Sequence, residues 1–196
     1  MDKKTDLIRS SFDKWAPSWD DNEGWDENVL SFLIDLLPQG PLPKVMDLAC
    51  GTGIMSKRLF DRYQGEVIGL DLSPKMLEVA KKKYEGNPHI KFQEGDFYEY
   101  VGNGFDLILL HNGYPHFLDV DGLCEKAYSV LKEDGILAIM HSCGREALNK
   151  HHEKNANPIS FTLSTPQEEA AKFKKRFDLL KEGESASFYY FILKRK

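Results

Sequence analysis

The sequence predicts an α/β fold built on a seven-stranded, mainly parallel sheet. From residue 45 onward, short apolar segments alternate with segments whose apolar residues recur at helical spacing. The apolar segments are nearly continuous, as expected of parallel strands that helices cover on both faces. Two features lie outside this alternation, namely helical segments before Pro38 and an antiparallel hairpin of strands at the C-terminal end.

The predicted elements follow one another in a regular order. Helices are expected at 5–19 and 26–37, the second ending before Pro38, which has no backbone N–H to continue it. Residues 143–164 show no periodic pattern, and a helix is expected at 165–177. A tight turn at 182–184 should join the last two strands, because Gly183 lies between polar residues. The strands are predicted at 44–49, 66–70, 90–93, 105–110, 135–141, 177–181 and 187–195, with core helices at 54–63, 74–84 and 118–131.

Composition narrows the class of protein. The 196 residues fit one domain, and a net charge of −5 gives no overall attraction to nucleic acid or to anionic membranes. Cys50, Cys124 and Cys143 are widely spaced and form no CxxC pair, so a reducing, cytoplasmic setting is expected. The N-terminal residues lead into no apolar signal region, and no apolar run is long enough to span a bilayer.

A turn that combines a carboxylate with glycines carries the functional prediction. The first predicted strand runs through Asp47 into Gly51 and Gly53, and glycines in a strand-to-helix turn let a ligand approach the backbone. Asp47 would repel a pyrophosphate and attract an ammonium group, while Ser56 stands where dinucleotide-binding turns have Gly or Ala. Asp71, which ends the next strand, is placed to accept hydrogen bonds from ribose hydroxyls. These residues favour a zwitterionic ligand that contains ribose over a dinucleotide.

Several segments resemble one family in order and spacing. They are residues 47–53, 67–77, 95–97, 105–108 and 131–137, together with 12–20 near the N-terminus. They resemble the class I S-adenosylmethionine-dependent methyltransferases, especially the small-molecule branch related to ubiquinone and menaquinone methyltransferases. The resemblance departs at Ala49, which replaces the first glycine of the family's loop, and at Trp19, where the family often has tyrosine. It implies a Rossmann-like single domain over 1–196, divided into a helical lid (1–37), a cofactor-binding core (44–142), a substrate-side insertion (143–164) and a terminal helix and strand pair (165–196).

The resemblance also implies how S-adenosylmethionine is bound. Asp47 and the backbone of Gly51 and Gly53 should hold the methionine end, and Asp71 should bind the ribose. The adenine should lie between Leu72 and Met76, with its amino group at Asp96 and with Phe97 beside it. The implied cofactor-binding residues are Trp19, Asp47, Ala49, Cys50, Gly51, Thr52, Gly53, Asp71, Leu72, Met76, Gly95, Asp96, Phe97 and His111.

Histidines gather after the fourth and fifth core strands, whose carboxyl ends face the ligand crevice of an open α/β sheet. An imidazole titrates near neutrality and can accept a proton from a hydroxyl, thiol or amine. His111, His116 and His141 are therefore candidates for a general base or a substrate anchor, although a single histidine is more often a hydrogen-bonded structural group or a surface residue. Several imidazoles with Cys143 could instead ligate a metal, but no spacing demands this and no metal is expected. The predicted substrate-binding residues are Tyr114, Arg145 and Asn149.

Three tryptophans, Trp15, Trp19 and Trp25, fall in the N-terminal segment. Part of this pattern is explained by the packing of an amphipathic helix. The functional alternative is a movable lid that seals the cofactor.

The predicted activity is methyl transfer from S-adenosylmethionine to a small molecule, with the acceptor atom left open. An RNA- or protein-directed methyltransferase and a noncatalytic cofactor-binding module remain as alternatives. Asp47, Ser56 and the terminal hairpin disfavour a nicotinamide-dependent dehydrogenase. The expected partner is a small-molecule substrate, without nucleic acid or membrane insertion, and the chain is expected to be a monomer or a homodimer.

Overall fold

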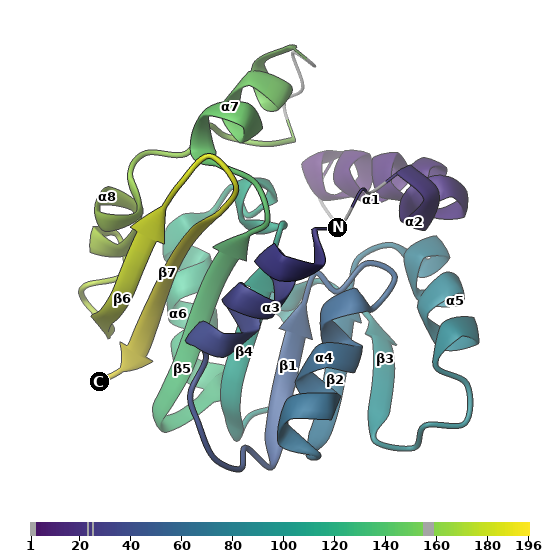
Figure 1. Ribbon diagram of the computed structural model, residues 1–196, viewed down its shortest axis with the longest axis horizontal. Coiled ribbons are helices and arrows are strands. Elements are labelled where there is room, and N and C mark those ends of the chain that lie inside the picture. The colour runs from purple at the N-terminus through teal and green to yellow at the C-terminus, as the bar shows by residue number, and fades with distance from the viewer. Residues whose placement is uncertain (1–2, 23, 25, 155–158) are drawn as a thin grey trace.

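A computed structural model describes residues 3–22, 24, 26–154 and 159–196. Within these residues one seven-stranded sheet has the order β3-β2-β1-β4-β5-β7-β6 (Figure 1). The first five strands are parallel, whereas β7 is antiparallel to both of its neighbours. The predicted fold class is therefore confirmed. The strands are β1 (Lys44–Leu48), β2 (Glu66–Asp71), β3 (Ile90–Glu94), β4 (Phe105–His111), β5 (Leu131–His141), β6 (Phe177–Glu184) and β7 (Tyr189–Arg195).

Helices cover both faces of the sheet. In Figure 1, α3 (Glu27–Leu36) and α4 (Ile54–Tyr63) lie over the face nearer the viewer, and α6 (Val120–Val130) and α8 (Pro166–Ala171) lie behind it. Successive residues of a strand point to opposite faces. In β4, Leu107 and Leu109 accordingly belong to the apolar cluster that includes α4, and Ile108 and Leu110 belong to the cluster that includes α6. This two-sided burial explains why the central strands are apolar at nearly every position.

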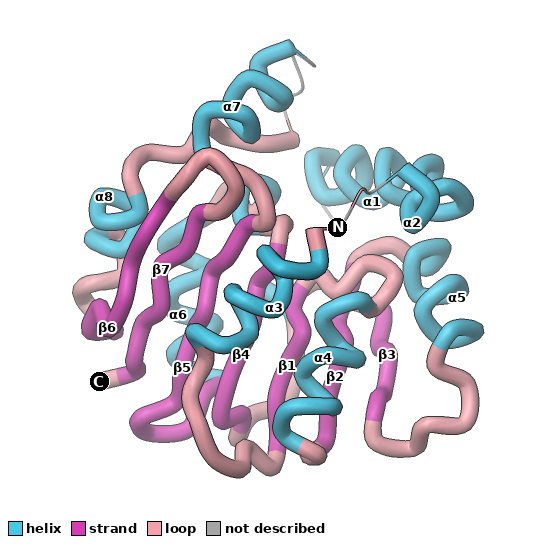
Figure 2. Tube along the Cα trace, viewed as in Figure 1, coloured by secondary structure: helices cyan, strands magenta, loops and turns pink. Residues whose placement is uncertain are grey.

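Three of the remaining helices stand at the edge of the sheet where the parallel strands end. α1 (Lys3–Trp15) and the short α2 (Trp19–Asn22), joined by a 3-10 turn at Ala16–Ser18, lie above this edge, and α7 (Arg145–Lys154) stands at the same edge nearer β6 and β7 (Figure 2). α5 (Pro74–Lys83) lies beside β3 and contacts both α1 and the 3-10 turn. In open α/β sheets the ligand crevice lies outside these carboxyl ends. No helix in the described part of the chain combines the length and apolar character that a membrane crossing requires.

Three element predictions were wrong. α7 occupies part of 143–164, where no helix was expected, because this helix is strongly polar and shows little apolar periodicity. The hairpin turns at 185–188 and not at 182–184, because Gly183 stays inside β6, paired with Tyr190. α8 ends at Ala171, short of the predicted residue 177. Trp25 lies outside the described residues, as do 155–158 of the predicted substrate-side insertion.

Candidate active site

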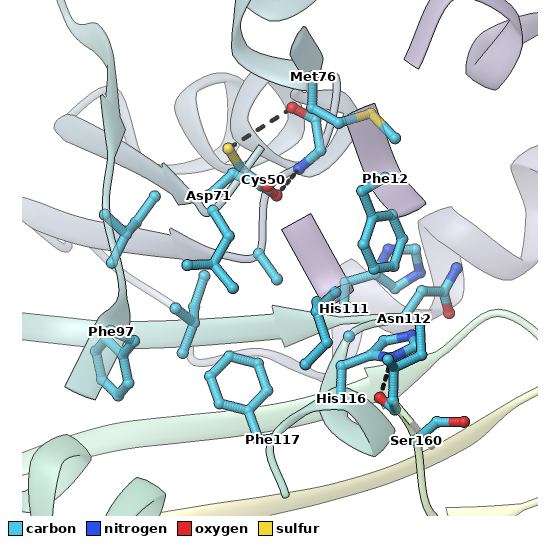
Figure 3. Close-up of a pocket in the computed structure, with 18 of the residues that line it drawn as sticks. Phe12, Cys50, Asp71, Met76, Phe97, His111, Asn112, His116, Phe117 and Ser160 are labelled. Carbon is cyan, nitrogen blue, oxygen red and sulfur yellow. Dashed lines mark hydrogen bonds between the residues drawn. The ribbon is translucent and has the colours of Figure 1, made fainter. Parts of the chain in front are cut away.

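A cavity of about 1350 Å³ opens at the carboxyl edge of the sheet. Its walls come from the ends of β1, β2 and β4, and α1 and α7 supply further walls (Figure 3). Pockets for one small ligand usually measure about 300–1,000 Å³. The cavity is therefore large enough for two ligands side by side. In Figure 3, Asp71 and Phe97 lie toward one side of the cavity, and Phe12, His116 and Ser160 lie toward the other.

The turn between β1 and α4 brings the backbone into the cavity wall. Ala49, Gly51 and Gly53 all have positive φ angles, of 55°, 51° and 85°. Gly53 caps α4, and a Cβ there would lie 2.8 Å from Tyr84 Cε2 and 2.9 Å from Phe92 Cζ. Only glycine satisfies both the left-handed conformation and this close packing. The sequence thus fixes the shape of the turn through two independent constraints at one residue.

Replacing Gly53 with alanine should reduce both the stability of the protein and the integrity of this turn. The left-handed strain costs about 1 kcal/mol, and crowding against Tyr84 and Phe92 adds roughly 1–3 kcal/mol. Gly86 is a matched control because it has a similar φ of +88°, and a Cβ added there would have nothing within 4 Å. In urea unfolding, Gly53→Ala should lose more stability than Gly86→Ala. Equal losses would show that crowding contributes nothing.

Asp47 is buried in the cavity wall at the end of β1. Its side chain is 1% exposed, and Ser56 Oγ donates to its Oδ2 over 2.6 Å. Burial raises the pKa of Asp47 to about 7; the Ser56 hydrogen bond lowers the pKa, and the neighbouring Asp71 raises it further. Ser56 was predicted only as a replacement for a packing glycine, and its hydrogen bond to the acid was missed. Asp47 is a desolvated carboxyl that a bound cation would help to ionise.

Asp71 ends β2 on the other side of the glycine turn. Its Oδ2 accepts from the Gly51 N–H and its Oδ1 from the Ser73 N–H, both over 2.8 Å. Burial nevertheless raises the pKa of Asp71 to about 6, against the lowering effect of these two hydrogen bonds. The backbone bonds also fix the orientation of the carboxyl. Two carboxyls with raised pKa values, one on either side of the turn, favour a ligand that brings positive charge and hydrogen-bond donors.

A mainly apolar wall continues from Asp71 along the cavity. Leu72 and Met76 come from the start of α5, and Gly95, Asp96 and Phe97 follow β3. Met76 and Phe97 are almost fully buried. Asp96 caps a short 3-10 turn by accepting from the Tyr98 N–H over 3.0 Å, which holds its carboxyl at the cavity. This part of the wall is therefore mainly apolar, with the Asp96 carboxyl as an acceptor beside it.

The N-terminal helices are tied to the cavity by two acids that sequence reasoning missed. Asp13 accepts from Ser73 Oγ over 2.6 Å, and Asp20 accepts from Thr52 Oγ1 over 2.6 Å. Lys83 also donates to Asp20, over 2.9 Å. α1 and α2 are thus fixed to the loops after both β1 and β2. Because the partners lie 32 to 63 residues away in sequence, no local pattern could have indicated them.

Replacing Asp20 with asparagine should weaken ligand binding in the cavity without unfolding the sheet. The variant loses the charge-assisted character of the bonds from Thr52 and Lys83, worth about 1 kcal/mol in total, or about fivefold in affinity. Asp21→Asn, at the next position of α2, is the matched control. Titration calorimetry and thermal unfolding would check both variants. Unchanged affinity in the Asp20→Asn protein would show that the hydrogen bonds of α2 do not support ligand binding in the cavity.

Of the three predicted histidines, the structure brings two to the cavity. His111 and His116 line it, and so do His151 and His152 of α7, which belong to the same group of histidines after the core strands but were not singled out as candidates. Burial lowers the pKa of His111 to about 3 and that of His152 to about 4, and it also lowers the pKa of His116. These imidazoles are therefore neutral at physiological pH. His141 does not line the cavity, because it is fully buried with its ring 5.9 Å from that of Tyr189.

The three predicted substrate-binding residues lie away from the cavity wall. Tyr114 is fully buried and donates to Glu169 Oε2 over 2.8 Å. Arg145 makes a two-pronged ion pair with Glu184. Asn149 uses its amide to bind both backbone groups of Leu163. Their predicted role as pocket lining was wrong, because each polar group is already engaged by a distant segment.

Gly53 likewise does not line the cavity, although the preceding residues of its turn do. Its part is to allow the turn, as described above. Within the described ranges, no cluster of three or more His, Cys, Asp or Glu side chains has an arrangement that could hold a metal ion. The other predicted cofactor-binding residues, from Trp19 and Asp47 to Phe97 and His111, all line the cavity.

Comparison with known proteins shows which family part of the chain resembles. Residues 45–135, from β1 to the start of β5, match the family model described as a methyltransferase domain. This segment, just under half of the chain, is therefore similar to methyltransferase domains. The match therefore covers the strands and turns that supply Asp47, Asp71 and the histidines after β4.

Two relatives of this methyltransferase domain act on small molecules according to their names. The demethylmenaquinone methyltransferase of Lactobacillus johnsonii is 35% identical over 104 residues, which cover 50% of this chain and 43% of that protein. The trans-aconitate 2-methyltransferase of Deinococcus radiodurans is 35% identical over 105 residues, covering 53% and 40%. The matches thus span less than half of the length of these two relatives.

Solved structures share the fold over nearly the whole chain. A methyltransferase from Haloferax volcanii, in complex with the activator Trm112, aligns with a TM-score of 0.80 at 18% identity over 94% of this chain and 97% of that one. The N-methyltransferase NodS from Bradyrhizobium japonicum, in complex with S-adenosyl-L-homocysteine, aligns with a TM-score of 0.73 at 13% identity over 99% of both chains. The methyltransferase fold therefore extends beyond the segment that the family model matches.

Proposed function

We propose that the chain transfers the methyl group of S-adenosylmethionine to a small-molecule acceptor. The observation that carries this proposal is the pair of carboxyls on either side of the glycine turn, the buried Asp47 and the half-buried Asp71, both with raised pKa values. S-adenosylmethionine has an ammonium group and ribose hydroxyls, the two features that such a pair would bind. Raised pKa values at both acids support the fit, because a cationic ligand with hydroxyl donors stabilises the ionised forms.

The wall residues suggest how the cofactor would lie. Asp47 would hold the ammonium group beside Gly51, and Asp71 would accept from the ribose. The adenine would occupy the slot between Leu72 and Met76 with its amino group toward Asp96, and Trp19 would cover the methionine end. Trp19 Nε1 lies 3.9 Å from the position of a Cβ on Gly51, which brings α2 directly over the turn.

The rest of the cavity supports a small acceptor. Its lining includes apolar rings and chains together with the imidazoles of His116 and His152, and Lys4 of α1 lines the same cavity. When bound, S-adenosylmethionine supplies an electrophilic methyl on a sulfonium that departs readily. The protein has then to align the acceptor with that methyl and to exclude water, and little further chemistry is required of it. Phe12, Trp15 and Trp19 on the N-terminal helices are placed to exclude water.

A methyl-transfer assay would test the proposal. Purified protein would be incubated with methyl-labelled S-adenosylmethionine and pooled small metabolites, and in parallel with total RNA and total protein from the same cells. We expect label in the small-molecule fraction. Label only in RNA or protein would favour a macromolecular acceptor, and cofactor binding with no label in any fraction would favour a noncatalytic module.

A further inference from the structure

Ser56 lies on the first turn of α4, within hydrogen-bond distance of the Asp47 carboxyl. The helix begins at Ile54, and Gly53 caps it without a side-chain hydrogen bond. Ser56 is fully buried, and its Oγ donates to Asp47 Oδ2 over 2.6 Å. Asp47 lines the cavity, whereas Ser56 does not. One hydroxyl outside the cavity therefore fixes a carboxyl that lies in its wall.

The residue type at position 56 is explained by the acid and not by the shape of the turn. Turns that bind a dinucleotide have Gly or Ala at this position, where the helix packs closely against the strand. Alanine would fill nearly the same space as Ser56. It would, however, leave the buried Asp47 carboxyl without the hydroxyl donor that partly compensates for its desolvation. The serine is therefore matched to the carboxyl of Asp47.

The titratable groups from the other elements around the turn do not help Asp47 to ionise. Asp71 of β2 raises the pKa of Asp47. Cys50 in the turn and Tyr84 at the end of α5 have raised pKa values, partly because of Asp47, so both are neutral at physiological pH. His111 at the end of β4 is also neutral there, because burial lowers its pKa to about 3. Support for the ionised carboxyl has to come from α4.

On α4, Ser56 is the residue that favours the ionised form. Its side-chain hydrogen bond is the largest influence that lowers the pKa of Asp47, and its backbone lowers that pKa further. Arg58, the charged residue two positions along the helix, is paired with Glu27 of α3. Burial outweighs the effect of Ser56, so the pKa of Asp47 stays at about 7. Without the hydroxyl, Asp47 would keep its proton up to a higher pH.

We propose that Ser56 is a positioning residue for cofactor binding, whose hydroxyl holds the Asp47 carboxylate for the ligand's ammonium group and sets the lowest pH at which that carboxylate is available. This inference rests on the proposed function and adds to it a residue that makes the turn selective for a cationic ligand. Ser56 acts through Asp47 and not by touching the ligand. Its effect should therefore be confined to ligands that carry an ammonium group.

The test compares two ligands by titration calorimetry of the full chain between pH 5 and pH 8. S-adenosylmethionine carries the ammonium group, whereas methylthioadenosine has the same adenosine and no ammonium group. Ser56→Ala removes the hydroxyl. Ser129→Ala is the matched control, because Ser129 also donates from a helix, to the Lys126 carbonyl of α6. A protein with both Asp47→Asn and Ser56→Ala shows whether the serine acts through the acid.

We expect the pH profile of S-adenosylmethionine affinity in Ser56→Ala to lie about one pH unit above that of wild type, because one hydrogen bond to a charged group is lost. The affinity should then be about tenfold weaker than wild type at pH 6 and about twofold weaker at pH 8. Ser56→Ala should bind methylthioadenosine normally, and Ser129→Ala should bind both ligands normally. The double variant should bind S-adenosylmethionine as Asp47→Asn alone does.

A structural role for Ser56 would weaken the binding of both ligands, or would weaken S-adenosylmethionine binding equally at every pH, and either result would overturn the proposal. A Ser56→Ala protein with the wild-type pH profile would overturn it as well, and so would a double variant that binds more weakly than Asp47→Asn alone. These outcomes leave the proposed function intact. A wild-type protein that fails to bind S-adenosylmethionine would overturn the proposed function, and this inference with it.

Discussion

Replacing Asp47 with asparagine is expected to weaken S-adenosylmethionine binding about 100-fold at pH 8, without lowering the stability of the free protein. The loss corresponds to about 3 kcal/mol for one buried charge-assisted contact with an ammonium group. The free protein should tolerate the change because burial disfavours the ionised carboxyl, and an amide oxygen can still accept from Ser56.

Calorimetry would give the affinity of this variant, and urea unfolding would give its stability. Asp61→Asn is the matched control, since Asp61 is a surface acid that pairs with Lys57 on α4, the helix that carries Ser56. The control should bind normally. An Asp47→Asn protein that binds as tightly as wild type would show that this carboxyl does not meet the ligand's cation. Loss of binding together with loss of stability would indicate a structural role.

The affinity for S-adenosylmethionine should increase about a thousandfold between pH 5 and pH 8. Asp47 has a pKa of about 7 and Asp71 a pKa of about 6 in the free protein, and the ligand requires both to be ionised. At pH 5 roughly one molecule in a thousand has both carboxylates, whereas most do at pH 8. Binding near pH 6.5 should therefore release protons, which calorimetry in buffers of different ionisation enthalpy measures directly.

The same two carboxyls should lower the stability of the free protein as the pH rises, whereas they raise its affinity for the cofactor. Their folded-state pKa values lie above about 3.9, the usual value for an unfolded aspartate. The stabilisation by their protonated forms is therefore complete below that value, and it is lost as the pH rises through 6 and 7. The thermal shift caused by saturating cofactor should accordingly grow from pH 5 to pH 8. An affinity that does not depend on pH would contradict the role of both acids.

The parts of the fold that sequence could predict are those with local causes. The strands of the parallel core were predicted because burial on both faces makes them apolar, as in β4, where Leu107 and Leu109 face one cluster and Ile108 and Leu110 the other. α7 could not be predicted in this way, because its residues are mostly polar. The hairpin turn was misplaced because a glycine between polar residues, such as Gly183, is locally typical of a turn. In the structure Gly183 lies inside β6, where a Cβ would meet the ring of Tyr190 on the paired strand.

In the candidate site too, residues with a local sequence signal were predicted correctly, and residues placed by distant contacts were not. Asp47, Asp71 and the glycine turn are recognisable because each residue type is required by its own position in the motif. Tyr114 was misassigned because its partner, Glu169, lies 55 residues away and only the folded chain brings the two together. His152 was grouped with the histidines at the crevice but not chosen as a candidate, because it lies on α7, a helix that the pattern did not indicate.

The central claim is that the two carboxyls at the glycine turn select S-adenosylmethionine over a dinucleotide. Its most direct test is a calorimetric titration of the purified chain at pH 8 with S-adenosylmethionine and, separately, with NAD. The structure predicts saturable one-to-one binding of S-adenosylmethionine and no detectable binding of NAD. Saturable binding of NAD, or no binding of S-adenosylmethionine at millimolar concentration, would contradict it.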